Sequence, residues 1–310
     1  MDKKIDISVD FAGRKLANPV FTASGTCGYA DDLADFMDVN SLGGFITKSI
    51  TLEPRKGNPS PRIVETDSGM LNAIGLANIG LERFIAEKLP IIANLSPAVF
   101  VNVAGKTLDE YIEVARRLAS RPEIAGLELN ISCPNVKKGG ITFGTDPLQV
   151  AEITGKVKKA AGDKILMVKL SPNVTDITVT ARAAVESGAD ALSLINTFTA
   201  MVIDIETGKP VLANRTGGLS GPAVKPIAVY MVNKVYSEVT KNTNVPILGL
   251  GGIRTASDAI EFIIAGASAV AVGTAIFIQP DTCRNIIDGI AQYCIRKNIT
   301  SLKTLTGSLA

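Results

Sequence analysis

Eight short runs rich in apolar and β-branched residues recur along the chain, and helical patterns lie between several of them. The intervening stretches at 108–121, 176–188 and 256–267 repeat apolar residues at helical spacing. Eight strand-then-helix units that close on themselves form a (β/α)8 barrel, so the pattern predicts this α/β fold, a TIM barrel. The eight runs are residues 20–24, 44–49, 98–105, 126–132, 165–171, 191–197, 245–252 and 269–274.

A doubly wound sheet would also alternate strands and helices. Its first nucleotide-binding turn normally carries a GxGxxG sequence early in the chain, and this chain has none. The sequence of 310 residues contains no linker and no low-complexity tract. Because barrels of this kind routinely reach such a length as one unit, we expect a single barrel domain over residues 1–310.

Three segments do not fit the strand-helix repeat. Residues 5–17 alternate apolar and polar side chains around a glycine, which predicts a hairpin that plugs the bottom of the barrel. Residues 52–72 contain three prolines and few periodic apolar residues, so we expect a long loop near the site. Residues 201–212 contain two strand-like runs around a turn sequence, which predicts a hairpin inserted after strand six.

The composition excludes several classes of catalytic site and of ligand. Histidine is absent, which excludes Ser-His-Asp and Cys-His nucleophiles, HExxH zinc sites and His-ligated iron. A net charge of +2 favours small ligands over nucleic acid or anionic lipid, and no segment approaches the roughly 20 apolar residues of a membrane span. The first residues are charged rather than signal-like, and the four cysteines form no close pair, so we expect a soluble protein of the reducing cytoplasm.

Polar residues occupy the ends of the predicted strands, where barrels of this type carry their chemistry. Two lysines and three asparagines directed into one barrel mouth would leave buried donors unpaired unless a ligand meets them, so we predict a ligand site there. The residues are Ser24, Lys48, Asn102, Asn130, Lys169, Asn196 and Thr197, with Cys133 shortly after strand four.

The last two strands end in paired or single glycines ahead of helical patterns. Backbone amides at such positions form a phosphate cradle, although Gly251, Gly252 and Gly273 could equally be tight turns. A phosphate cradle together with two lysines suits flavin mononucleotide (FMN), whose reduced ring carries negative charge near N1. The alternative for Lys48 and Lys169 is a structural ion pair.

Cys133 lies in NISCPNVKKGG, a Pro-Asn turn that leads into a glycine-rich loop suited to act as a lid. In a chain without histidine, a thiolate with positive neighbours or in a desolvated pocket can remove a proton from carbon. The alternative is a small buried apolar side chain, which we expect for Cys283 and Cys294 because they lie in helical patterns.

Nine motifs, in order along nearly the whole chain, resemble those of class 1 dihydroorotate dehydrogenase. They are ASGTCGY, ITKSIT, NAIGLAN, NISCPNV, VKLSPNV, INTF, GLSGPAVKP, GLGGI and VGTA. The resemblance implies an FMN-containing (β/α)8 barrel that oxidises dihydroorotate to orotate in pyrimidine synthesis, with one non-covalent FMN per chain. It implies that Cys133 removes the C5 proton while hydride passes from C6 to the flavin.

The resemblance also implies two sets of binding residues. Those expected to hold the substrate are Lys48, Asn72, Ala73, Ile74, Gly75, Leu76, Asn130, Asn135, Asn196 and Thr197. Those expected to line the FMN are Ser24, Lys48, Ser49, Asn102, Asn130, Lys169, Ile195, Gly221, Gly251, Gly252, Gly273 and Thr274. No metal is expected.

The route of the electrons divides the class. One group resembles homodimers that use fumarate; the other, class 1B, resembles enzymes that reduce NAD through a subunit carrying FAD and a [2Fe–2S] cluster. The continuation VKKGGITFG after NISCPN is more similar to the second group, which implies a homodimer within a heterotetramer. Dihydropyrimidine dehydrogenase-like and dihydrouridine synthase-like enzymes, or a non-catalytic barrel, are the remaining alternatives.

Overall fold

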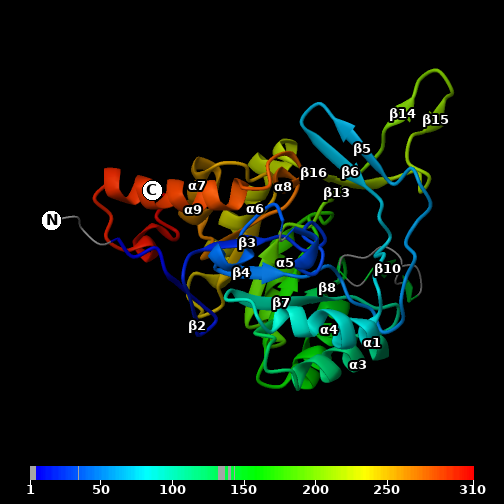
Figure 1. Cartoon of the computed structure of the whole chain (residues 1–310), viewed down its shortest axis with the longest axis horizontal. Helices are drawn as coiled ribbons and strands as arrows, with labels where there is room; N and C mark the ends of the chain where they lie inside the picture. Colours follow the sequence, from blue (N-terminus) through cyan, green and yellow to red (C-terminus); the bar gives the residue numbers. More distant parts are fainter. Residues whose placement is uncertain (1–4, 34, 132–136, 139–140, 143) are drawn as a thin grey trace.

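Eight parallel strands close into a barrel in the computed structural model, which describes residues 5–33, 35–131, 137–138, 141–142 and 144–310. Each strand lies inside one of the eight predicted runs, so the (β/α)8 prediction is confirmed (Figure 1). In barrel order the strands are β3 (Val20–Thr22), β4 (Gly44–Ile46), β7 (Ala98–Val103), β8 (Gly126–Asn130), β11 (Ile165–Lys169), β12 (Ala191–Leu194), β17 (Ile247–Leu250) and β18 (Ala269–Val272).

Helices cover the outside of the barrel, and the three that the sequence predicted are present. Each ends two residues before its predicted end, because the last residues turn away from the helix axis, as at the cap Gly266 with φ +125°. The helices are α1 (Leu81–Arg83), α2 (Leu89–Ile92), α3 (Leu108–Ala119), α4 (Pro147–Ala161), α5 (Ile177–Glu186), α6 (Lys225–Val235), α7 (Ala256–Ala265), α8 (Ala275–Ile278) and α9 (Thr282–Arg296).

Three aromatic rings close the N-terminal end of the barrel. The predicted hairpin forms from β1 (Val9–Phe11) and β2 (Arg14–Leu16), and the Phe11 ring lies 5.6 Å from Phe21 and 6.1 Å from Phe100 between centroids. Glycines on neighbouring strands make room, because a Cβ on Gly44 would lie 2.0 Å from the Phe21 ring and one on Gly126 would lie 2.6 Å from Phe100. We call these three phenylalanines the floor of the barrel.

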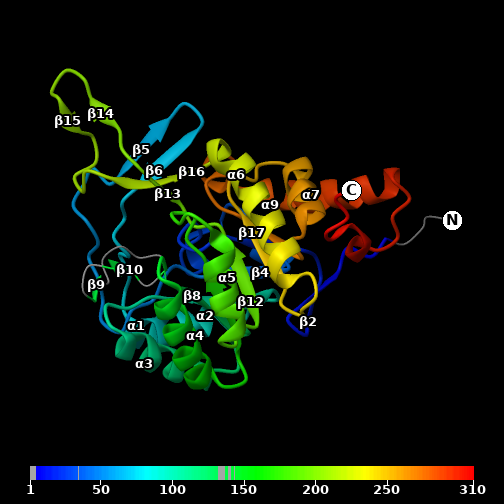
Figure 2. The ribbon, with the colours of Figure 1, turned by 180° about the vertical axis from the view of Figure 1, so that it is seen from behind.

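A separate antiparallel sheet stands beside the barrel, in the order β13, β16, β6, β5 (Figures 1 and 2). Its strands are β5 (Ile63–Thr66), β6 (Gly69–Asn72), β13 (Phe198–Ala200) and β16 (Gly217–Ser220). The prediction of a long loop over 52–72 was therefore wrong for its second half. Local patterns do not predict this hairpin, because β6 is also paired with β16, a strand nearly 150 residues later in the chain.

The predicted insertion after strand six is confirmed. Strand β14 (Ile203–Asp204) pairs antiparallel with β15 (Lys209–Pro210), and both views show this hairpin projecting beyond the added sheet. The main core includes buried residues from Val9 to Leu305, and the single domain over residues 1–310 stays a prediction. No helix in the described part of the chain has the length and apolar character needed to cross a membrane.

Candidate active site

The polar residues of four adjacent strands point into the barrel near its carboxyl end. Side chains alternate along a strand, so Asn102 shares the inner face of β7 with the floor residue Phe100. In the same way Glu128 lies on the face of Gly126 in β8, and Lys169 ends β11 directly beside Ser193 of β12. All four of these polar side chains are buried.

Lys169 has an anionic partner inside the barrel. Its Nζ lies 3.8 Å from Oε2 of Glu128 and donates a hydrogen bond of 3.0 Å to Oγ of Ser24. The ion-pair alternative for Lys169 is therefore realised, and the predicted cofactor residue Ser24 is held by the same ammonium.

Asn102 continues this set of contacts across the barrel. Its Nδ2 donates to Glu128 Oε2 at 2.6 Å, and its Oδ1 accepts a short hydrogen bond from the hydroxyl of Ser49. Ser193 Oγ donates to the other carboxylate oxygen of Glu128 at 2.8 Å. We call Ser24, Ser49, Asn102, Glu128, Lys169 and Ser193 the mouth network.

Sequence reasoning missed two members of the mouth network, Glu128 and Ser193. Glu128 has 0% exposure, and a glutamate inside an otherwise apolar strand is the signal that could have identified it. Alternation places it two residues before Asn130 and on the same face. Ser193 gave no comparable signal, because a lone serine in a buried strand is common.

Lys48 differs from Lys169. It follows β4, is half-buried, and its backbone N–H donates to Gly28 O at 2.8 Å. Among the described residues, its ammonium has no hydrogen-bond or ion-pair partner. This leaves Lys48 as the lysine suited to meet an anionic group of a ligand.

The Asn196–Thr197 turn is braced by the loop after β11. The Thr197 N–H donates to Asn196 Oδ1 at 2.9 Å, and Asn173 Nδ2 donates to Thr197 O at 2.9 Å. Asn173 Oδ1 also accepts from Thr199 N at 2.9 Å. Asn173 therefore holds the backbone of Thr197, one of the predicted substrate residues, and sequence reasoning named it only within the motif VKLSPNV.

The predicted substrate segment that follows β6 is a fixed turn. Asn58 Nδ2 donates to Ala73 O at 2.9 Å, and the Asn58 N–H donates to Ile74 O at 3.0 Å. Gly75 and Leu76 both have positive φ, and Asn72 Nδ2 reaches Gly218 O at 3.5 Å. The segment thus lies between residues 52–62 and the added sheet.

Asn130, another predicted substrate residue, is the last residue of β8. Its backbone carbonyl accepts a hydrogen bond of 2.8 Å from the Tyr111 hydroxyl.

The predicted phosphate-binding residues come together. A Cβ on Gly252, whose φ is +80°, would lie 2.7 Å from the carbonyl oxygen of Gly221. A Cβ on Gly251 would lie 2.8 Å from the Ala228 side chain and 3.3 Å from that of Ile195. The turns after β16, β17 and β18 therefore share one side of the barrel, where Thr274 Oγ1 donates to Ser220 Oγ at 2.8 Å.

One part of the predicted cradle needs correction. Helix α7 does not begin directly after Gly252, because Thr255 caps it and forms a reciprocal capping box with Asp258. Lys225 donates a hydrogen bond of 2.8 Å to Asp258, and this bond raises the pKa of the Lys225 ammonium. Burial alone would raise the pKa of Asp258, but Lys225 and the amides of Arg254 and Thr255 lower it. The amides of Arg254, Thr255 and Asp258 are thus already engaged, whereas Gly221 and Thr274 each directly precede a helix.

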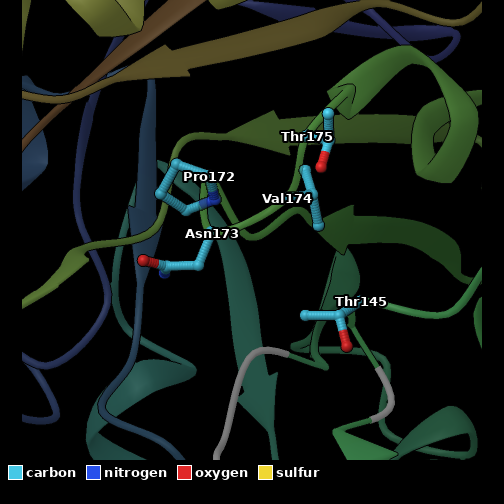
Figure 3. A pocket seen from close by; sticks show the side chains of 5 residues that line it. All are labelled: Thr145, Pro172, Asn173, Val174 and Thr175. Carbon is cyan, nitrogen blue, oxygen red and sulfur yellow. The ribbon is translucent and has the colours of Figure 1, made fainter.

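Two predicted site residues, Cys133 and Asn135, lie outside the described residues. Thr145 and the loop 172–175 line an open cavity of about 490 Å³ beside the predicted site (Figure 3). The other cysteines are free and buried, as expected for Cys283 and Cys294. Burial raises the pKa of Cys27 to about 11 and that of Cys283 further, so neither thiol supplies a thiolate near neutral pH.

The described residues fit a flavin mononucleotide in two respects. Gly251, Gly252 and Gly273 are half-buried, so their backbone is partly accessible on one side of the mouth, as a phosphate requires. A buried ammonium, Lys169, and a half-buried one, Lys48, provide the positive charge that a reduced ring requires.

Comparison with known proteins gives matches over nearly the whole chain. The model of the family described as dihydroorotate dehydrogenase matches residues 6–294. The chain is 54% identical over 306 residues to the dihydroorotate dehydrogenase B (NAD(+)), catalytic subunit, of Geotalea daltonii, with 99% of each chain covered. It is 51% identical over 306 residues to the protein of the same name from Alkaliphilus metalliredigens, again with 99% of each covered.

A solved structure shares the fold. The crystal structure of DHODH in complex with ferulenol from Eimeria tenella superposes with a TM-score of 0.82 at 25% identity. The match covers 99% of this chain and 90% of that chain. The likeness therefore includes the barrel and its additions together.

Proposed function

This chain belongs to the dihydroorotate dehydrogenase family, and from that premise we propose that it oxidises dihydroorotate to orotate in pyrimidine biosynthesis, with NAD as the final acceptor. The observation that carries the proposal is the identity of 50–54% over nearly the full length to relatives named as NAD-linked catalytic subunits. These names favour the NAD-linked type over the fumarate-linked homodimer and over a non-catalytic barrel.

The family is flavin-dependent, and we propose one non-covalent FMN per chain as the flavin. The chemistry that FMN supplies when bound is the acceptance of hydride. The glycine turns would hold its phosphate, and Lys169, Ser24 and the buried amide of Asn102 would face its ring. The full set proposed for FMN is Ser24, Lys48, Ser49, Asn102, Asn130, Lys169, Ile195, Gly221, Gly251, Gly252, Gly273 and Thr274.

The substrate is proposed to lie between Lys48 and the asparagines of the mouth. The Lys48 ammonium pairs with the carboxylate of dihydroorotate, and asparagine amides suit the ring because each both donates and accepts. Asn173 holds the backbone of Thr197, and the Thr197 N–H in turn holds the side chain of Asn196, so both residues are in place before substrate arrives. The full set proposed for the substrate is Lys48, Asn72, Ala73, Ile74, Gly75, Leu76, Asn130, Asn135, Asn196 and Thr197.

Cys133 is the proposed general base. Its thiolate takes the proton from C5 while hydride leaves C6, and the electron pair of the broken C5–H bond forms the C5–C6 double bond of orotate. The chain has no histidine, and burial keeps Cys27 and Cys283 protonated, so neither of these thiols competes for this role.

The name catalytic subunit, carried by the relatives, implies a second subunit in their enzymes. We propose that this chain likewise passes its electrons to a subunit that carries FAD and a [2Fe–2S] cluster, as a homodimer within a heterotetramer. A cytoplasmic location remains a prediction from the cysteine spacing.

The test is made on the purified chain. We expect a yellow protein that releases FMN on denaturation and whose flavin is bleached by dihydroorotate under anaerobic conditions, with no reduction of NAD until the partner subunit is added. Fast turnover with fumarate would assign the chain to the other group. A colourless protein that gains no flavin on incubation with FMN would overturn the enzymatic proposal.

A further inference from the structure

The proposed mechanism gives no role to Glu128, a carboxylate fully buried inside the barrel. A carboxylate in such a place is costly unless it is paired and hydrogen-bonded, because burial removes its hydration. Packing alone does not explain this desolvation cost, since a neutral side chain of similar size would fill the same space.

The contacts of Glu128 are those of an ionised group. Oε2 accepts from Asn102 Nδ2 at 2.6 Å, and Oε1 accepts from Ser193 Oγ at 2.8 Å. Both oxygens are thus acceptors, and among the described residues none accepts a proton from Glu128. A carboxylate that only accepts hydrogen bonds is held in its charged form.

The countercharge is Lys169, whose Nζ lies 3.8 Å from Glu128 Oε2. Lys169 donates to Ser24 Oγ at 3.0 Å on its other side, so the ammonium is held between two groups from β8 and the turn after β3. Inside the barrel water screens little, so the carboxylate offsets much of the positive charge that Lys169 presents to the mouth.

We propose that Glu128 is a positioning residue that fixes the direction of the Lys169 ammonium and lowers its effective charge, and that it thereby lowers the reduction potential of the bound flavin. The inference rests on the proposed function, because it requires a flavin beside Lys169. A cation near N1 favours the reduced ring, so an anion that offsets this cation favours the oxidised ring. Glu128 would then keep the flavin ready to pass its electrons on.

The test is a redox titration of the flavin in the purified holoprotein and its variants. Glu128→Gln removes the charge and keeps the shape, so the potential should rise. Lys169→Gln should lower it, and the double variant should lie between the two. We expect Glu128→Gln to change the relative affinity for reduced and oxidised flavin about tenfold, which is about 30 mV for a two-electron couple.

Ser193→Ala is a second test variant, because it removes a hydroxyl dipole that offsets part of the negative charge of Glu128 and leaves Glu128 and Lys169 in place. It should shift the potential slightly downward, opposite to Glu128→Gln. If Glu128→Gln does not fold, the sign of the potential shift in Ser193→Ala tests the inference instead. An unchanged or raised potential in that variant overturns the inference.

Failure of the inference is separable from failure of the proposed function. A wild-type chain that binds FMN and is reduced by dihydroorotate, with a Glu128→Gln variant of unchanged potential, makes Glu128 a structural residue and leaves the function standing. A wild-type chain without flavin removes both proposals together.

Discussion

The floor and the mouth network meet on β7, where their side chains are equally buried, yet the two sets are held together differently. Phe100 and Asn102 are two residues apart on β7 and both have 0% exposure. Phe100 needs only rings of the right shape around it, whereas Asn102 needs partners from β8 and from the turn after β4. Burial therefore does not distinguish the end of the barrel that stabilises from the end proposed to react; the chemistry of the contacts does.

The largest effect is expected at the floor. Phe100→Ala leaves a cavity between Phe11 and Phe21 and should lower the free energy of unfolding by about 3–5 kcal/mol. Urea denaturation measures this loss, and Phe277→Ala, at a side chain that is 59% exposed, should change it by less than about 0.5 kcal/mol. The reduction potential of flavin bound to the folded Phe100→Ala variant should match the wild type. A shifted potential would mean that the two ends are coupled.

The next effect is expected at Cys133, the proposed general base. Cys133→Ala should leave flavin bound but slow its reduction by dihydroorotate about 10²-fold or more, because a general base contributes that much. Anaerobic stopped-flow absorbance gives the rate, and Cys133→Ser should keep a little activity that rises with pH. A wild-type rate in Cys133→Ala would assign the thiol a structural role.

A smaller effect is expected at the glycine turns. Gly252→Ala places a Cβ 2.7 Å from Gly221 O at a φ of +80°, so the turn must shift, and FMN affinity should fall about tenfold. Fluorescence titration of FMN with the flavin-free protein measures the dissociation constant. Gly208→Ala, at φ +65° on the projecting hairpin with no atom within 4 Å, introduces similar backbone strain away from the site. Equal losses of affinity in the two variants would refute the cradle.

The smallest effect is expected at the rim, where Asp176 caps α5 after the loop that braces Asn196. The hydrogen bond from Lys234, with those from Thr178, lowers the pKa of Asp176 to about 2 from its ordinary 3.8. Because the folded pKa is lowered, this stabilisation is present above about pH 4 and is lost as the pH falls toward 2.

Thermal melting at pH 4.5 and pH 2.5, compared between wild type and Asp176→Asn, checks this dependence. The variant should lose less of its melting temperature over this interval than the wild type. The decrease in melting temperature caused by Phe100→Ala should be the same at both pH values, because the floor contains no titratable group. An identical pH slope in wild type and Asp176→Asn would contradict the assignment.

Much of the fold and part of the site could be predicted from the sequence. All eight strands, three helices, two hairpins and the clustering of Ser24, Lys169 and Asn102 followed from local patterns and from the rule that strand ends meet at one face of a barrel. The β5–β6 hairpin did not follow, since its pairing with β16 depends on a distant segment. The start of α7 at residue 256 was predicted correctly, but its capping by Thr255 was not predicted.

The sequence by itself determined the alternation that makes the barrel, the absence of histidine chemistry and the polar identity of the strand ends. Only the tertiary structure decided which of these polar groups satisfy one another. Lys48 and Lys169 look alike in the sequence, each near the end of a strand, yet Lys169 is paired with Glu128 while Lys48 has no partner among the described residues. The reason is that a local pattern sets the direction of a side chain, whereas its partner comes from the neighbouring strand, and the distance between them exists only once the barrel has closed.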